Sequence, residues 1–270
     1  MRTYTDSISS RAAKSLLFLF LLLLAGQGYG QGTPEPEVSD ISTNRPDLSQ
    51  SAQVVPQGTV QVEVGVSYWK DTPDGTRVNA HTYPDVAVRI GLLKWLELQL
   101  EGAVQDSIVR EAGSRRKVRG VGPWSAGVVA SLWDEKGSLP AVALRGALTL
   151  PIGNDAFAPR HAEPEFTLAA SKSITEQSEV LLNLGYSWEG GDPIPHLVLN
   201  LGTALSQTLS VYIETALDKP QGEGAAYLAD SGILWRLRPN LQLDLAAGRQ
   251  LNSLATDYFF TTGVSVRLPR

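Results

Sequence analysis

The chain has 270 residues, no cysteine and a formal net charge of −5 at pH 7, from 23 lysines and arginines against 28 aspartates and glutamates. The lack of cysteine excludes a disulfide framework and a thiol-linked lipid anchor. The acidic balance argues against a nucleic-acid partner, because phosphate binding needs a basic surface.

The first thirty residues have the order of a secretory signal peptide. Three basic residues precede the apolar stretch Leu16 to Ala25, and small residues follow it. The stretch is short of the roughly 20 residues that a spanning helix needs, so it favours export over anchoring. We expect residues 1–30 to be cleaved near Gly30, which removes three bases and one acid and leaves a formal charge of −7.

The segment 31–58 resembles neither of its neighbours. Its centre, ISTNRPDLSQ at 41–50, lacks both the apolar character of the leader and the alternation of a strand, yet it carries the charged turn Arg45-Pro46-Asp47. We expect an N-terminal periplasmic segment here.

From residue 59 to the end, apolar and polar residues alternate in long runs, as in TVQVEVGVSYW at 59–69. A period of two over ten residues predicts a β-strand. Most predicted strands are longer than the 5 to 6 residues or so of soluble sheets and suit a tilted strand of about 9 to 11 residues crossing a membrane. The twelve predicted strands are 59–68, 82–92, 95–103, 123–133, 140–150, 165–174, 179–188, 196–205, 210–218, 226–237, 241–249 and 257–268.

The predicted links alternate in length. Only Leu93-Lys94 separates the second strand from the third, whereas 69–81 and 104–122 are expected to be long loops. Short periplasmic turns alternating with long outer loops are typical of bacterial outer-membrane barrels. Aromatic residues near strand ends indicate interfacial girdles: Tyr68, Trp69, Trp95, Trp124, Trp133, Trp188, Trp235 and Tyr258.

These patterns predict an all-β fold over residues 59–270, a transmembrane antiparallel up-and-down β-barrel of about 12 strands in the bacterial outer membrane. In lipid every backbone polar group needs a partner from the protein, so a sheet survives there only when it closes on itself. Apolar side chains then face lipid and polar ones face inward. The alternative is a soluble β-sandwich or barrel with aromatics at its margins.

On this alternation a set of polar side chains points into the barrel. Charged linings select solutes in pores, but the same residues would also hold the interior together by pairing with one another. The set has six acids and three arginines: Glu63, Arg89, Glu97, Glu101, Arg145, Asn183, Asn200, Glu214, Asp230, Asp244 and Arg267.

The excess of acids leaves two roles open for the charged turn. In the first, Arg45, on a turn fixed by Pro46, enters the barrel as a plug or gate and pairs with carboxylates such as Glu97 or Glu101. In the second, the segment is a periplasmic lead-in whose Asp47 caps its own turn.

The expected outer loop 104–122 is basic. Its cations would contact lipopolysaccharide phosphates, or the loop is an ordinary solvated one; they are Arg110, Arg115, Arg116, Lys117 and Arg119.

Short motifs follow one another in order from about residue 41 to the end of the chain. The first are Thr43-Asn44-Arg45-Pro46-Asp47 and Val55-Pro56-Gln57-Gly58. The later ones are Arg89-Ile90-Gly91-Leu92, Glu97-Leu98-Gln99-Leu100, Gly120-Val121-Gly122-Pro123, Leu148-Thr149-Leu150-Pro151-Ile152-Gly153, Asn183-Leu184-Gly185, Asp230-Ser231-Gly232-Ile233, Gln242-Leu243-Asp244 and Gly263-Val264-Ser265-Val266-Arg267-Leu268. In this order the chain resembles the putative MetA-pathway-of-phenol-degradation family of bacterial outer-membrane transporters. Asn44 and Pro123 depart from it, since the family often has Asp at both places.

The resemblance implies passive passage of small molecules across the outer membrane, with a family name that points at aromatic or hydrophobic compounds. We expect outer-membrane lipid, lipopolysaccharide and a small solute as partners, and no cofactor, metal or catalytic residue. The alternatives are a lipid-modifying hydrolase and a structural barrel without transport. The sharpest comparison for a hydrolase is a twelve-stranded phospholipase with closely spaced His and Ser, but none of His81, His161 and His196 has Ser two places on.

Overall fold

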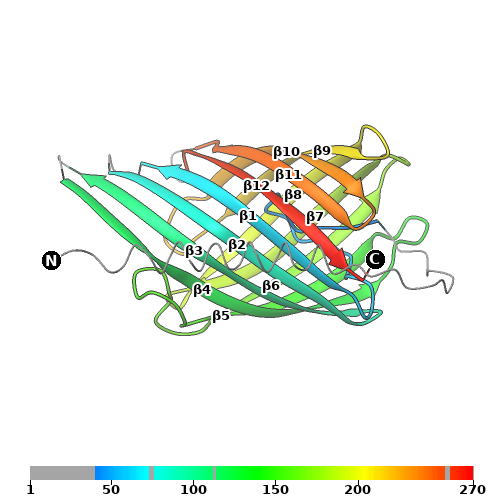
Figure 1. Ribbon diagram of the computed structural model, residues 1–270, viewed down its shortest axis with the longest axis horizontal. Coiled ribbons are helices and arrows are strands. Elements are labelled where there is room, and N and C mark those ends of the chain that lie inside the picture. Colours follow the sequence, from blue (N-terminus) through cyan, green and yellow to red (C-terminus); the bar gives the residue numbers. More distant parts are fainter. Residues whose placement is uncertain (1–39, 73–75, 112–113, 253–255, 270) are drawn as a thin grey trace. The chain divides into compact units, whose positions relative to one another are not determined.

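The computed structural model describes residues 40–72, 76–111, 114–252 and 256–269, which form a closed barrel of twelve antiparallel strands (Figure 1). Each strand pairs with its neighbours in the chain, and the first pairs with the last to close the ring. None of the described residues belongs to a helix long and apolar enough to cross a membrane. The predicted fold and strand number are confirmed, whereas the expected signal peptide, 1–30, lies outside the described residues. The strands are β1 (Val60–Asp71), β2 (Arg77–Leu93), β3 (Leu96–Glu111), β4 (Ser114–Trp133), β5 (Ala141–Leu150), β6 (Glu163–Ser173), β7 (Ser178–Glu189), β8 (Asp192–Ala204), β9 (Leu209–Asp218), β10 (Ala226–Arg238), β11 (Leu241–Gln250) and β12 (Tyr258–Leu268).

Alternation along each strand puts apolar side chains on the outside of the ring and polar ones on the inside. In β1, Val66 is 48% exposed, whereas Gln61 and Glu63 are fully buried at 0%. Trp95, Trp133 and Trp235 are exposed beside the short turns that link β2–β3, β4–β5 and β10–β11. The closed ring leaves no strand edge unpaired, which is the condition for a sheet to exist in hydrocarbon.

Strands β1 to β4 extend beyond their predicted ends, and the expected loops 69–81 and 104–122 are wrong. Most of these residues continue β1, β2, β3 and β4 as hairpins, which reach beyond the tips of β10 to β12 at the left of Figure 1. Polar residues occupy both faces of these extensions, so the period of two is lost from the sequence. Irregularities around Tyr83-Pro84 and Gly122-Pro123 shift the register as well.

Residues 40–58, here called the inserted segment, lie within the ring and contact its inward side chains (blue in Figure 1). The amide of Ile41 donates to the carbonyl of Pro239 at 2.9 Å, beside the β10–β11 turn. At the other end, the amide of Gly58 donates to the carbonyl of Gly91 at 2.8 Å. Only glycine fits at 91, because a Cβ there would lie 2.1 Å from the carbonyl oxygen of Pro56.

Candidate functional site

One part of the lumen wall is a network of paired charges. The guanidinium of Arg89 lies between two carboxylates: its Nε donates to Oε1 of Glu97 at 2.6 Å, and its Nη1 to Oε1 of Glu63 at 3.3 Å. All three side chains are almost completely buried. A buried charge is costly unless it is paired and hydrogen-bonded, so these predicted lining residues hold one another in place.

The two other predicted arginines are also bonded to the wall. Arg145 pairs with Glu165 at 2.6 Å and with Glu101 at 3.2 Å. The Nε of Arg267 donates to Oε1 of Gln61 at 3.0 Å. The structure therefore brings the predicted arginines to side chains of the wall itself.

Arg45 of the inserted segment also reaches the wall, but not at the expected partners. Its Nη1 lies 3.2 Å from Oδ2 of Asp85, and its Nη2 lies 3.6 Å from Oδ1 of Asp244. The expected pairing with Glu97 or Glu101 is wrong, because Arg89 and Arg145 already occupy those two carboxylates.

Two glycines leave the space that the Arg45 guanidinium occupies. Gly65 of β1 and Gly263 of β12 are paired in register. A Cβ at Gly65 would lie 2.1 Å from Cζ of Arg45, and one at Gly263 would lie 2.5 Å from its Nε. The guanidinium thus fills space that any other residue at these positions would occupy.

Main-chain groups of the inserted segment bond to the predicted lining. A carboxylate that accepts an amide N–H makes a charge-assisted hydrogen bond, which is stronger than a neutral one. The amide donors and their acceptors are Asn44 to Glu63 at 3.2 Å, Leu48 and Ser49 to Glu214 at 2.7 and 3.1 Å, Val55 to Glu97 at 2.7 Å, and Gln50 to Oδ1 of Asn183 at 2.6 Å.

Asp47, at the turn of the segment, lies among acids of the opposite wall. Its Oδ2 accepts from Nδ2 of Asn200 at 3.2 Å, and its Oδ1 accepts no hydrogen bond. Asp230 stands opposite Glu214 in the β9–β10 register, and neither oxygen of Asp230 has a hydrogen-bond partner within 3.5 Å. Burial and the neighbouring Glu214 carboxylate raise the pKa of Asp47 well above its ordinary value.

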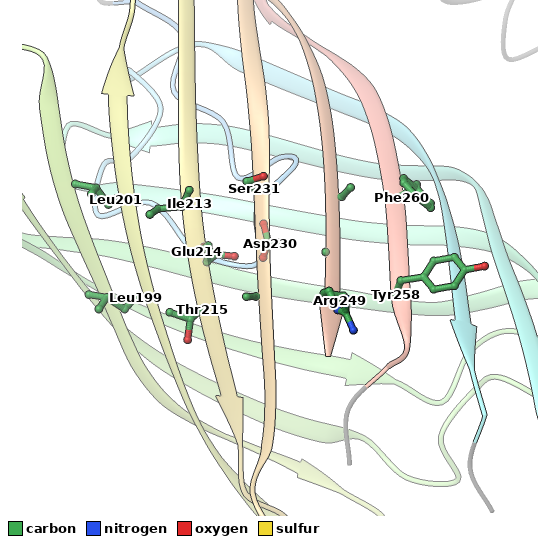
Figure 2. Close-up of a pocket in the computed structure, with 13 residues that line it drawn as sticks. Leu199, Leu201, Ile213, Glu214, Thr215, Asp230, Ser231, Arg249, Tyr258 and Phe260 are labelled. Atoms are coloured by element: carbon green, nitrogen blue, oxygen red, sulfur yellow. The ribbon is translucent and has the colours of Figure 1, made fainter. Parts of the chain in front are cut away.

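A hollow on the outer face lies beside these acids. It has a volume of about 830 Å³, lies against β8 to β12 and is lined by exposed Leu199, Ile213 and Phe260. Glu214 and Asp230 also line it, and Figure 2 shows their carboxylates on adjacent strands, directed toward one another. Only one layer of backbone therefore separates the acid cluster from the outer face.

A cavity of about 490 Å³ adjoins the inserted segment near the start of β8 and the end of β9. Leu48 of the segment lines it together with the inward-facing Trp69 and Leu228. Glu189 and Asp218 add two carboxylates near the ends of β7 and β9. The cavity thus offers apolar and acidic contacts to a small molecule, with the segment as part of its wall.

Two of the histidines are hydrogen-bonded to side chains other than serine. Nδ1 of His81 lies 2.8 Å from Oδ1 of Asp106, and Nε2 of His196 lies 3.1 Å from Oγ1 of Thr167. Within the same residues, no group of three His, Cys, Asp or Glu side chains is placed to hold a metal ion.

Sequence reasoning missed several inward polar residues. Gln61 and Gln99 continue the alternation of Glu63 and Glu97, so extending the same pattern would have found them. Asp85 directly follows the irregular Tyr83-Pro84 pair, where the alternation has no defined phase. The missed residues that are buried or bonded to the lining are Gln61, Asp85, Gln99, Glu165, Thr167, His196, Gln242, Thr261 and Ser265.

A closed antiparallel barrel with an apolar exterior, a charged interior and short turns at one end has the architecture of the outer-membrane β-barrels. Within that class the chain belongs to the family described as "Putative MetA-pathway of phenol degradation", which matches residues 43–268. The resemblance based on ordered motifs is thereby confirmed. No curated protein matches the chain.

Solved outer-membrane barrels of low sequence identity share this fold. An outer-membrane channel from Pseudomonas putida superimposes with a TM-score of 0.67 at 12% identity and covers 83% of this chain and 100% of its own. The translocator domain of autotransporter NalP from Neisseria meningitidis gives 0.55 at 10% identity, over 97% of this chain and 98% of its own. The NanC porin gives 0.50 at 9% identity, over 77% and 98%.

Proposed function

We propose that the protein is an outer-membrane channel through which small molecules pass passively, and that the inserted segment is its plug. The observation that carries the proposal is the set of hydrogen bonds from the segment's amides to the charged lining. The family and the channel and porin among the similar structures support passage of small solutes. The proposed passage involves no chemical step.

The proposed solutes are small aromatic or other hydrophobic molecules. The family description mentions phenol degradation, which supports this class. The cavity beside Leu48 supports it too, because Trp69, which stacks on Phe259 with ring centroids 4.4 Å apart, offers a flat apolar surface there. A solute bound in this cavity would lie against the segment and pass when the segment moves.

The plug is proposed to be movable because many of its attachments are polar. They include hydrogen bonds and an ion pair to the wall, beside the buried apolar side chains Ile41, Ala52 and Val55. Ala52 packs with Ala141 and Ala169. Water can replace polar contacts of this kind at modest net cost, whereas the ring itself is held by continuous strand pairing.

Deletion of residues 31–50 tests the proposal in planar bilayers. We expect single-channel conductance to rise and its noise to fall, because the segment no longer occupies the lumen. Unchanged conductance and noise would remove the plug from the proposal. Swelling of liposomes with sugars and with small aromatic solutes tests the channel itself, since a barrel that admits neither solute, with or without the segment, would be a structural protein.

A further inference from the structure

Three arginines stand side by side at the tips of the longest strands. In the strand registers, Arg77 of β2 is opposite Arg110 of β3, which is opposite Arg115 of β4. All three are exposed, and none forms an ion pair with a carboxylate of the described residues. Like charges directly opposite one another destabilise a sheet. Among the described residues, Asp257 attracts Arg77 from beyond ion-pair distance and itself pairs with Lys70 at 3.0 Å, so the row keeps an excess of positive charge.

The row lies on the outer face of the barrel. Even-numbered residues of β3 point outward, as the 39% exposed Leu100 does, whereas the buried Glu97 and Gln99 point inward. Arg110 shares the outward phase, and residues paired in register share a face, so Arg77 and Arg115 point outward with it.

Two more cations extend the row toward the apolar exterior. Lys117 and Arg119 alternate with Arg115 on the same face of β4. Nζ of Lys117 lies 3.1 Å from Oδ2 of Asp106, and the Arg119 guanidinium lies 5.2 Å from the centre of the Tyr83 ring. These contacts hold both cations against the sheet. Together, the five form what we call the basic surface: Arg77, Arg110, Arg115, Lys117 and Arg119.

The basic surface begins where the apolar exterior ends. Val121, two residues from Arg119 on the same face, is 46% exposed, and Trp124 beyond it is 44% exposed. With a rise of about 3.3 Å per residue, the cations lie between about 7 and about 20 Å along the strand from Val121. Anionic headgroups lie directly beyond the acyl chains of a leaflet, so the surface is at the depth where headgroup phosphates occur.

The basic surface is opposite in sign to the net charge of the whole chain. The chain is acidic, at −5, whereas residues 105–120 hold five basic side chains against two acidic ones. Guanidinium groups bind phosphate oxygens through paired N–H donors. From the register, the outward phase and this depth, we infer that the basic surface binds phosphate groups of the glycolipid headgroups in the outer leaflet. The inference goes beyond passage through the lumen and does not depend on the inserted segment.

The test compares lipopolysaccharide before and after enzymatic removal of its phosphates, bound to the full mature protein in detergent. The variant is Arg77→Gln/Arg110→Gln/Arg115→Gln. The control for the type of substitution is Arg249→Gln, which neutralises one exposed arginine of β11 outside the basic surface. We expect the triple variant to bind phosphorylated lipopolysaccharide about tenfold or more weakly, and the control to bind within about twofold of the unsubstituted protein. Both should bind the dephosphorylated form as weakly as the unsubstituted protein does.

Equal binding of the two lipopolysaccharides, or an unaffected triple variant, would overturn the inference. Inorganic phosphate serves as a second probe, because an affinity equal to that for lipopolysaccharide would assign the surface to free anions instead. Heat-modified migration on gels checks that the variants are folded. As a second readout, the triple variant should unfold at the same or higher denaturant concentration in lipid-free detergent, since repulsion within the row is relieved. A large loss of stability there would mean that the arginines are structural and would also overturn the inference.

Discussion

Buried charged groups have different partners on the two sides of the lumen. On the side of β1 to β6, Arg89 and Arg145 each lie between two carboxylates, with N–O distances of 2.6 to 3.3 Å. On the side of β8 to β10, Asp47, Glu214 and Asp230 gather, and no arginine or lysine of the described residues forms an ion pair with them. The surplus negative charge therefore faces the turn of the inserted segment.

This difference separates the stability of the wall from the docking of the segment. Removing one member of a buried ion-paired network lowers the free energy of unfolding by several kcal/mol, because the remaining charge stays buried without its partner. A cluster of acids without cations becomes more stable when one of its charges is neutralised, because the repulsion between the carboxylates falls. We therefore expect substitutions on the paired side to affect unfolding and those on the acid side to affect docking.

The largest expected effect is that of Arg89→Met. It leaves Glu63 and Glu97 buried without their cation, so we expect the free energy of unfolding to fall by about 3–5 kcal/mol. Urea unfolding of the barrel refolded in detergent micelles measures it. The double variant Arg89→Met/Glu97→Gln should recover part of the loss. A fall below about 1 kcal/mol for Arg89→Met would mean that the pairing contributes little.

The next effect is that of Gly65→Ala, which places a Cβ where the Arg45 guanidinium lies. We expect docking of the segment to weaken by about 1–3 kcal/mol and single-channel conductance to rise to the level of Arg45→Ala. In the Arg45→Ala background the glycine substitution should have no further effect, since the two residues act through one contact. Gly202→Ala is the control, because the nearest atom to its Cβ would be 3.9 Å away. Additive effects of the substitutions at Arg45 and Gly65 would contradict the prediction that the two residues act through one contact.

The sequence predicted the ring well because one physical rule governs it. Strands that separate hydrocarbon from a polar interior must alternate, and the alternation places Glu63, Arg89 and Glu97 on the inner face. The rule stops at the edge of the apolar layer, where both faces are solvated, so it does not predict the ends of β1, β2, β3 and β4.

The alternation rule does not predict which wall residues the inserted segment contacts. Counting acids against arginines predicts that Arg45 meets a carboxylate, but which one depends on the closure of the ring. Asp85 and Asp244 lie far apart in the sequence and converge only because β12 pairs with β1. The space for the guanidinium comes from two glycines paired across that same seam, Gly65 and Gly263.

A third effect concerns pH, through Asp47. Its pKa is raised in the docked segment by burial and by Glu214, with Asp230 adding to the repulsion. A group with a raised pKa favours docking below its free value of about 3.9, and this contribution is lost as the pH rises through the docked value. Conductance should therefore increase with pH, and Asp47→Asn should flatten the dependence. A conductance that falls as the pH rises would contradict the sign.

The smallest expected effect is that of replacing one aspartate by asparagine, which is compared between the two sides of the lumen. Asp230→Asn removes a carboxyl group that stands opposite Glu214 and has no cation partner. At a pH at which Asp230 is ionised, docking should therefore strengthen by less than about 1 kcal/mol and conductance should fall slightly. Asp244→Asn removes a carboxylate that lies 3.6 Å from Arg45, so docking should weaken and conductance should rise. The opposite signs follow from the local charge balance alone, because both residues change from carboxylate to amide on an inner strand face. Conductance shifts of the same sign in both variants would show that the two sides do not differ as their contacts indicate.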